Sequence, residues 1–229
     1  MQRISILKYL AALAFFGSVP ASAGSLAVSP LRITLSGATG ISSVTVENNG
    51  REEALVQAET FAWHQVSGEH KLSTTDDVVA VPPVFRLAPG AQQQVRIGLT
   101  RAFTEKVEQT FRLTITEVPT AAVPGTVAVA VRHSLPIFVR PSSALSSNLA
   151  AKRHPLNGLE IGNSGNQHVR IHRWRLSDSA GAILAEDSGP GYLLAGASQV
   201  LLVPDNSIKR AVLFEADSDA QTLKIAVGE

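Results

Sequence analysis

The chain has 229 residues, and its 20 basic and 19 acidic side chains give a formal net charge of +1 with histidine neutral. This balance, together with the small number of aromatic residues, argues against nucleic acid as a partner, because nucleic-acid binding requires a basic surplus. Cysteine is absent, so the fold must be stabilised by burial of apolar side chains in one or two cores rather than by disulfides.

The first 23 residues predict a cleavable export signal. Arg3 and Lys8 make its start positive, Tyr9 to Val19 form an apolar run, and Ala21-Ser22-Ala23 has the small-x-small pattern of a cleavage site. The run is too short to cross a bilayer with margin, which disfavours the alternative of an uncleaved anchor. Cleavage removes two basic residues and no acid, so 18 basic and 19 acidic residues remain and the net charge becomes about −1.

Short strand-like segments separated by turns follow the signal. The predicted strands cover residues 26–35, 41–47, 54–64, 79–87, 92–99, 111–118 and 127–141. Asn48-Asn49-Gly50 and Ala88-Pro89-Gly90 have turn chemistry, and Pro82-Pro83 marks its segment as an edge strand or a strand that leads into a loop. About seven short strands at this spacing predict an immunoglobulin-like β-sandwich.

The composition changes after Pro141. Residues 142–155 begin with a serine-rich stretch and predict a linker or mobile loop. Residues 156–229 again contain short strand-like segments, separated by glycine, asparagine and aspartate. The chain is therefore predicted to be all-β, with a signal over 1–23, a first sandwich over 24–141 and a smaller second β-sandwich over 156–229.

Five segments of the first domain together point to one family: Ser29–Ile33, Asn48-Asn49, Pro82–Ile97, Thr116–Pro119 and Pro136–Pro141. In this order, and with the export signal, they resemble the periplasmic pilus-assembly chaperones of the chaperone–usher pathway. The resemblance implies two immunoglobulin-like domains set at an angle, like a boomerang, and a periplasmic location. It also implies pilus or fimbrial subunits and an outer-membrane usher as partners, and no cofactor.

The late strand carries the predicted subunit-binding side chains. Val127, Val129 and Val131 alternate with alanines, so an extended strand places the three valines on one face. The resemblance implies that this strand inserts these side chains into a subunit that lacks its final strand. Alternation alone instead favours an ordinary core strand. The sequence leaves open whether the free protein caps this edge by forming a homodimer.

The resemblance further implies two basic residues that bind the C-terminal carboxylate of the subunit. Arg32 matches the first of them. The second, a lysine in well-studied members, aligns with Pro136, a departure that resembles the divergent archaic branch. Arg112 on the neighbouring strand is the predicted substitute, because a guanidinium binds a carboxylate bidentately. The alternative for Arg112 is an ordinary solvated strand residue.

A salt bridge that sets the interdomain angle is also implied by the resemblance. Arg140 matches the family arginine of this bridge, and Glu108 aligns with one acidic partner. Asp217 or Asp219 is expected to supply the other acid from the second domain.

Catalytic and metal-binding motifs are not found in the sequence. It has no cysteine nucleophile, no Gly-x-Ser-x-Gly, no His-Glu-x-x-His and no phosphate-binding glycine loop. His168 and His172 would lie about 13 Å apart along a strand, too far to share a metal ion, and are predicted to be surface residues. Neither an enzymatic activity nor a metal or cofactor is therefore expected.

Two other functions remain as alternatives. A fibre subunit or adhesin is also exported and immunoglobulin-like, but such a subunit is expected to be a single domain that lacks its own last strand. A carbohydrate-binding sandwich would need aromatic stacking surfaces. Aromatic residues are too few for such a surface, and Trp63, Trp174 and Tyr192 are expected to be widely separated.

Overall fold

The computed structural model describes residues 26–37, 40–119, 130–155, 158–203 and 205–228. Nearly all regular structure in this part of the chain is β-strand, with one short 3₁₀ helix, η1 (Asp205–Arg210). No helix among these residues is long and apolar enough to cross a membrane. The predicted signal over 1–23 lies outside the described residues.

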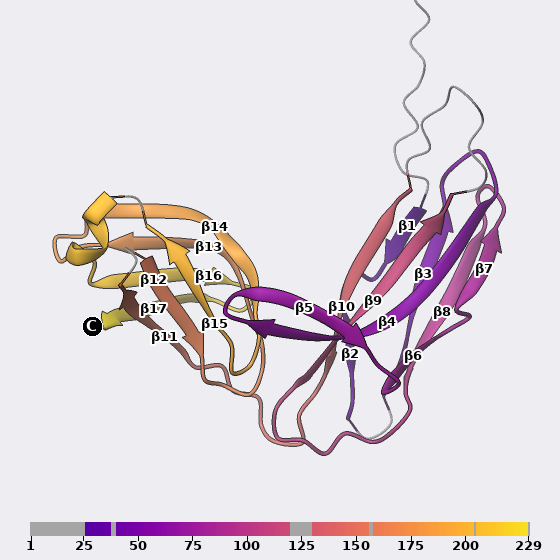
Figure 1. Ribbon diagram of the computed structural model, residues 1–229, viewed down its shortest axis with the longest axis horizontal. Coiled ribbons are helices and arrows are strands. Elements are labelled where there is room, and N and C mark those ends of the chain that lie inside the picture. Colours follow the sequence, from indigo (N-terminus) through magenta and orange to yellow (C-terminus); the bar gives the residue numbers. More distant parts are fainter. Residues whose placement is uncertain (1–25, 38–39, 120–129, 156–157, 204, 229) are drawn as a thin grey trace, which may run out of the picture.

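Two lobes set at an angle make up the molecule (Figure 1). The first lobe has one sheet in the order β1-β3-β8-β6 and a second in the order β2-β10-β9-β4-β5, with β7 also paired to β4. The first sheet contains β1 (Leu26–Ser29), β3 (Ile41–Asn48), β6 (Val78–Val81) and β8 (Gln92–Leu99). The second contains β2 (Ile33–Leu35), β4 (Ala54–Val66), β5 (Glu69–Thr74), β7 (Val84–Leu87), β9 (Gln109–Val118) and β10 (Arg132–Val139).

Strand alternation accounts for the core of the first lobe. On β9, Phe111, Leu113 and Ile115 are buried in this core, and on β10 Leu135 and Ile137 join them. Burying an apolar side chain of this size contributes about 1.5–3 kcal/mol relative to exposure, so the register that buries this set is strongly favoured. The alternate residues of both strands lie on the opposite face of the sheet, which points away from this core.

The Pro82-Pro83 pair divides one predicted segment into two strands. β6 pairs with β8 at the edge of one sheet, and β7 pairs with β4 in the other sheet. Proline has no backbone N–H to donate to a ladder, so the chain passes from one sheet to the other at this point. The structure therefore has two short strands where the sequence predicted one edge segment.

The second lobe is also a β-sandwich, which confirms the predicted fold of two immunoglobulin-like domains. Its strands are β11 (Leu149–His154), β12 (Gly158–Asn163), β13 (Val169–Ser177), β14 (Ile183–Leu193), β15 (Ser198–Leu202), β16 (Leu213–Ser218) and β17 (Thr222–Gly228). They are ordered β14-β13-β16-β17-β11-β12-β15, and a short parallel pairing of β11 with β17 joins the two layers.

The predicted linker over 142–155 is too long. Its last part forms β11, which pairs with β12 along its whole length and buries Ala151 in the core of the second lobe. Backbone groups that are paired in a sandwich cannot act as a mobile connection. The stretch between the lobes among the described residues is therefore confined to residues 140–148.

Candidate functional site

Three residues form a row across the second sheet of the first lobe, on the face that points away from its core. Pro136 on β10 pairs with Arg112 on β9. Ile137 pairs with Ile33, the first residue of β2, so Arg32 lies beside Pro136 on the other side. Residues side by side on neighbouring strands project from the same face. The two predicted anchor arginines thus flank Pro136, the position at which the sequence departs from the family lysine.

Arg112 has no acidic partner among the described residues. Its guanidinium carbon lies 3.7 Å from the centre of the Trp63 ring, and Nη1 donates a hydrogen bond to the carbonyl oxygen of Ser134 at 3.3 Å. Burial lowers the pKa of the Arg112 guanidinium, and Tyr192 acts in the opposite direction. Arginine nevertheless stays protonated at neutral pH. A partly desolvated positive charge without a counter-ion favours an incoming anion.

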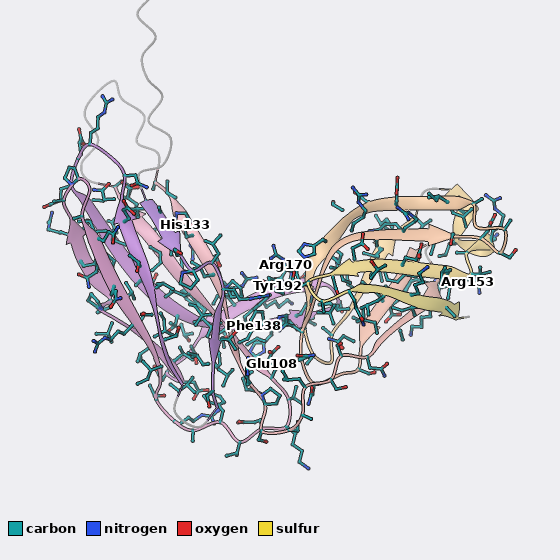
Figure 2. All side chains as sticks on the ribbon, turned by 180° about the vertical axis from the view of Figure 1, so that it is seen from behind. Glu108, His133, Phe138, Arg153, Arg170 and Tyr192 are labelled. Atoms are coloured by element: carbon teal, nitrogen blue, oxygen red, sulfur yellow. The ribbon has the colours of Figure 1, made fainter. Side chains whose placement is uncertain are left out.

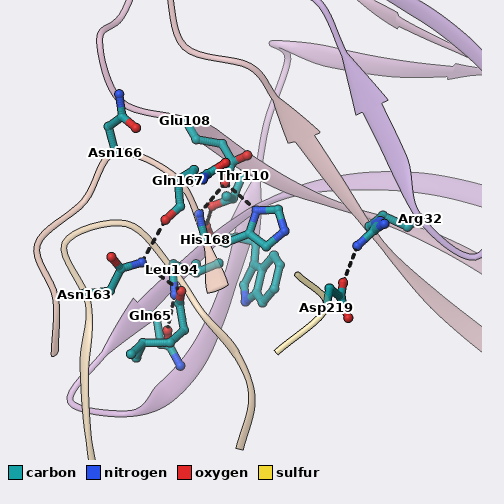
Figure 3. Close-up of polar contacts among 12 residues, drawn as sticks. Arg32, Gln65, Glu108, Thr110, Asn163, Asn166, Gln167, His168, Leu194 and Asp219 are labelled. Carbon is teal, nitrogen blue, oxygen red and sulfur yellow. Dashed lines mark hydrogen bonds and ion pairs between the residues drawn. The ribbon is translucent and has the colours of Figure 1, made fainter. Parts of the chain in front are cut away.

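Arg32, in contrast, contacts an acid of the second lobe. Its Nη1 donates to Oδ2 of Asp219 at 2.6 Å (Figure 3). The other carboxylate oxygen of Asp219 lies 2.5 Å from Nε2 of His172, which is on β13. The two predicted anchor arginines therefore differ in the structure, because Arg32 already binds a carboxylate of its own chain and Arg112 does not.

β10 leaves part of one edge open. β9 pairs with β10 from Arg132 to Val139, whereas β2 pairs only with Ile137–Val139. Within the described ranges, no strand pairs with the remaining part of β10 on the β2 side. The N–H and C=O groups of such an edge can pair with a strand from another protein.

Of the three predicted donor valines, only Val131 is described, and Val127 and Val129 lie outside the described residues. The carbonyl oxygen of Val131 accepts a hydrogen bond from the backbone N–H of Glu117 at 2.9 Å, which continues the register of β9 and β10. Val131 is half-buried and, by alternation, has the same orientation as Leu135. The donor role of the valines stays a prediction.

The contact between the lobes differs from the predicted salt bridge. Oε2 of Glu108 accepts a hydrogen bond from the backbone N–H of His168 at 2.9 Å and lies 2.7 Å from Nδ1 of the same residue (Figure 3). Arg140 is exposed and forms no ion pair with any described residue, and Asp217 accepts a hydrogen bond from Thr222 in its own hairpin. His168, which belongs to the second lobe, thus supplies the hydrogen-bond partners of the buried Glu108 carboxylate, while Arg140 is exposed to solvent.

His168 is therefore not the surface residue that the sequence suggested. Its ring stacks on Phe138 with 3.6 Å between ring centres, and Phe138 and Tyr192 also contact each other (Figure 2). Trp63, which is fully buried, packs against Tyr192 at 5.7 Å and against Phe138 at 6.1 Å. Trp63 and Phe138 belong to the first lobe but join the core of the second. We call these four residues, Trp63, Phe138, His168 and Tyr192, the junction cluster.

The expected separation of the aromatic residues is correct for Trp174 but wrong for Trp63 and Tyr192. Trp174 packs on Phe214 inside the second lobe. Trp63 reaches Tyr192 because the long hairpin of β4 and β5 extends from the first lobe to the second (Figure 1). At its end, Gln65 donates to the carbonyl oxygen of Tyr192 at 3.1 Å and accepts from the N–H of Leu194 at 3.0 Å.

Comparison with known proteins gives a family for this arrangement. Residues 25–145 match the family described as pili and flagellar-assembly chaperone, PapD N-terminal domain, and this match covers more than half of the chain. The chain belongs to this family. It is a family of chaperones and not of enzymes, and the predicted assignment to pilus-assembly chaperones is confirmed.

Two curated relatives are also named as chaperones. The chaperone protein FimB/FhaD of Bordetella pertussis is 26% identical over 179 residues, which are 70% of this chain and 71% of that protein. The chaperone protein FaeE of Escherichia coli is 29% identical over 144 residues, which are 61% of this chain and 53% of that protein.

Solved structures with low sequence identity share the fold. The complex of the chaperone CsuC with the tip adhesion subunit CsuE, from the archaic chaperone-usher Csu pili of Acinetobacter baumannii, superposes with a TM-score of 0.69 at 16% identity, covering 90% of this chain and 100% of that chain. The E. coli chaperone DraB gives a TM-score of 0.63 at 19% identity, covering 89% and 95%.

The chaperone is expected to lose stability in mild acid through His70. Partial burial of its ring against Trp63, and to a smaller extent the positive charge of Arg112, lowers the pKa of His70 below its ordinary value of 6.5. Nε1–H of Trp63 donates to Nδ1 of His70 at 3.1 Å, which requires that Nδ1 carry no proton. The unfolded chain therefore binds this proton more readily than the folded chain, and the free energy of unfolding should fall as the pH decreases through about 6.5.

Urea denaturation at pH 7.5 and 5.5 measures this effect. His70→Gln removes the titrating group, so its loss of stability between the two pH values should be smaller than that of the wild type. His64→Gln changes an exposed histidine of β4, the strand that pairs with β5, and should retain the wild-type difference. An unchanged difference in His70→Gln would show that His70 does not couple to folding.

Proposed function

We propose that this protein is a periplasmic chaperone that binds pilus subunits by donor-strand complementation and delivers them to an outer-membrane usher. The row formed by Arg32, Pro136 and Arg112, beside the open edge of β10, is the observation that carries the proposal. Family membership supports the chaperone function, and this row supports the mode of binding.

The first step of the proposed mechanism is binding of the C-terminal carboxylate of the subunit in the cleft. Arg112 offers a guanidinium that no acidic group among the described residues neutralises, and its stacking on Trp63 restricts its orientation. A hydrogen bond between charged groups contributes about 1.5–3 kcal/mol, more than a neutral one. Fixing one end of the subunit strand at Arg112 and Arg32 would also set its register along β10.

The second step is pairing of the open edge of β10 with the subunit. Val127, Val129 and Val131 would then fill the groove that the missing strand of the subunit leaves open. Full burial of one valine contributes about 1.5 kcal/mol or more, so three valines contribute on the order of 5 kcal/mol before ordering costs. The ordering cost is reduced because β9 already holds the start of β10 in an extended conformation.

The contacts between the lobes would keep the two sides of the cleft in place for this step. The junction cluster connects the lobes, and the Glu108–His168 contact and the two hydrogen bonds of Gln65 extend this connection from His168 and from Tyr192. A cleft that is already formed loses less conformational freedom when it binds a partner, so binding is tighter.

Val129→Asp tests donor-strand complementation. In the proposed complex this side chain enters an apolar groove, where a carboxylate must be desolvated or protonated at a cost of several kcal/mol. We expect co-expressed subunit to be lost from the soluble one-to-one complex, while the melting temperature of the chaperone changes by no more than about 2 °C.

Val79→Asp is the matched control, since it makes the same change at an exposed valine of β6, in the other sheet. This variant should bind subunit normally. If Val129→Asp fails to fold, Val129 belongs to the core of the chaperone, and if it folds and captures subunit normally, the donor register is wrong. Formation of polymers by the wild-type chain would indicate a fibre subunit instead, and size-exclusion chromatography of the free chain tests the predicted capping homodimer.

A further inference from the structure

Asp219 holds a position in the cleft that no part of the proposed mechanism uses. It follows β16 in the turn before β17, and its two carboxylate oxygens contact different lobes. Oδ2 accepts from Arg32 of the first lobe at 2.6 Å, and Oδ1 lies 2.5 Å from Nε2 of His172 of the second. Among the described acidic residues, Asp219 alone pairs with Arg32.

This contact has the chemistry that the anchor is proposed to offer to a subunit. A C-terminal carboxylate and an aspartate carboxylate present the same two acceptor oxygens to a guanidinium. Resting on the proposed function, we propose that Asp219 is an internal carboxylate that occupies Arg32 in the free chaperone and is exchanged for the carboxylate of the arriving subunit.

The ion pair between Arg32 and Asp219 is exposed to solvent, so an external carboxylate can reach it. The side chains of Arg32 and Asp219 are 49% and 36% exposed. Ion pairs at this degree of exposure are weak, so an external carboxylate can replace the internal one. Both residues line a small cavity of about 180 Å³ at the cleft, which Arg170 and His168 also line. An incoming carboxylate can therefore approach Arg32 from solvent without a rearrangement of either lobe.

Asp219 is charged whenever the exchange would take place. Burial alone would raise the pKa of its carboxyl group, but hydrogen bonds from His172 and Arg32 outweigh this effect and hold the pKa below the ordinary value of 3.8. After the exchange, Asp219 keeps His172 as a partner and is not left without one. Arg112 meanwhile remains without an acidic partner, so it can bind the subunit carboxylate before Arg32 is released.

The test uses acetate as the probe and the Nε–H signal of Arg32 as the readout, in ¹⁵N NMR spectra of the full chain. Arg32→Gln identifies the signal by its loss. In Asp219→Asn, acetate should shift this signal at a concentration about two- to fivefold lower than in the wild type, because the weak internal competitor is absent. Acetamide, which has no charge, should produce no shift.

Asp217→Asn is the matched control. It removes the same charge two positions away, from a side chain that contacts Thr222 and not Arg32. Its acetate response should equal that of the wild type. An equal response in Asp219→Asn and the wild type would overturn the proposal, and so would a gain of the same size in Asp217→Asn, which would indicate a general effect of charge.

Subunit capture provides a second, separable measurement. Asp219→Asn should retain more co-expressed subunit than the wild type, and the gain should vanish in the double variant with Arg32→Gln. Normal or reduced capture in the single variant would contradict the exchange. If no variant captures any subunit, the proposed chaperone mechanism fails, whereas the acetate titration still decides whether Asp219 blocks Arg32.

Discussion

Capture of pilus subunits is expected to fall at least about tenfold when Arg112 is replaced by glutamine. Glutamine keeps part of the apolar stem over Trp63 but removes the positive charge that has no acidic partner among the described residues. Loss of a charge-assisted hydrogen bond of about 1.5–3 kcal/mol corresponds to a factor of about 10–100 in affinity. Co-purified subunit per chaperone, and the dissociation constant with a purified subunit, measure the effect.

Arg32→Gln should also reduce capture. The measured loss of affinity understates what Arg32 contributes to binding, because in the wild type Arg32 must first release Asp219 before it binds the subunit. If both arginines bind one carboxylate, the double variant should lose less than the product of the two single losses. Arg96→Gln, at an exposed position of β8 in the other sheet, is the control and should capture normally. Normal capture by Arg112→Gln together with loss in Arg32→Gln would place the second cation elsewhere.

Trp63→Ala is expected to lower the free energy of unfolding by about 3–5 kcal/mol, the largest effect on stability that we predict. The indole is fully buried between the lobes, and its loss would leave Phe138 and Tyr192 facing a cavity. Arg112 would also lose the ring on which it stacks. Chemical denaturation followed by circular dichroism measures the loss.

The same variant should loosen the angle between the lobes, which small-angle scattering reports as a larger radius of gyration. Trp63→Phe fills most of the space but cannot donate to His70, so its cost should be clearly smaller. Gln65→Ala removes the two hydrogen bonds at the hairpin end and leaves the junction cluster intact, which separates the two contributions. A loss below about 1 kcal/mol in Trp63→Ala would show that the junction cluster does not hold the lobes together.

The residues that the sequence could not assign are those whose partners come from the other lobe. Glu108 was predicted to pair with Arg140 but contacts His168, and His168 was predicted to be a surface residue. A strand pattern reports which face of a sheet a residue is on, but not what packs against that face. One signal was available: by alternation, Trp63 lies on the face opposite Val56 and Ala58, and so large an aromatic residue there indicates a second covering layer.

The local elements of this protein are determined by the sequence itself. Alternation, turn residues and the Pro82-Pro83 pair predict most of the strands and the two sandwiches, because these signals depend on neighbouring residues alone, but they miss β5 and β11. The position of Arg112 beside Pro136 follows from strand register, and the contact of Arg32 with Asp219 depends on how the lobes are set. Only the tertiary structure decided that, among the described residues, Arg32 has an acidic partner and Arg112 has none, because an ion pair between residues 187 positions apart depends on the packing of the whole chain.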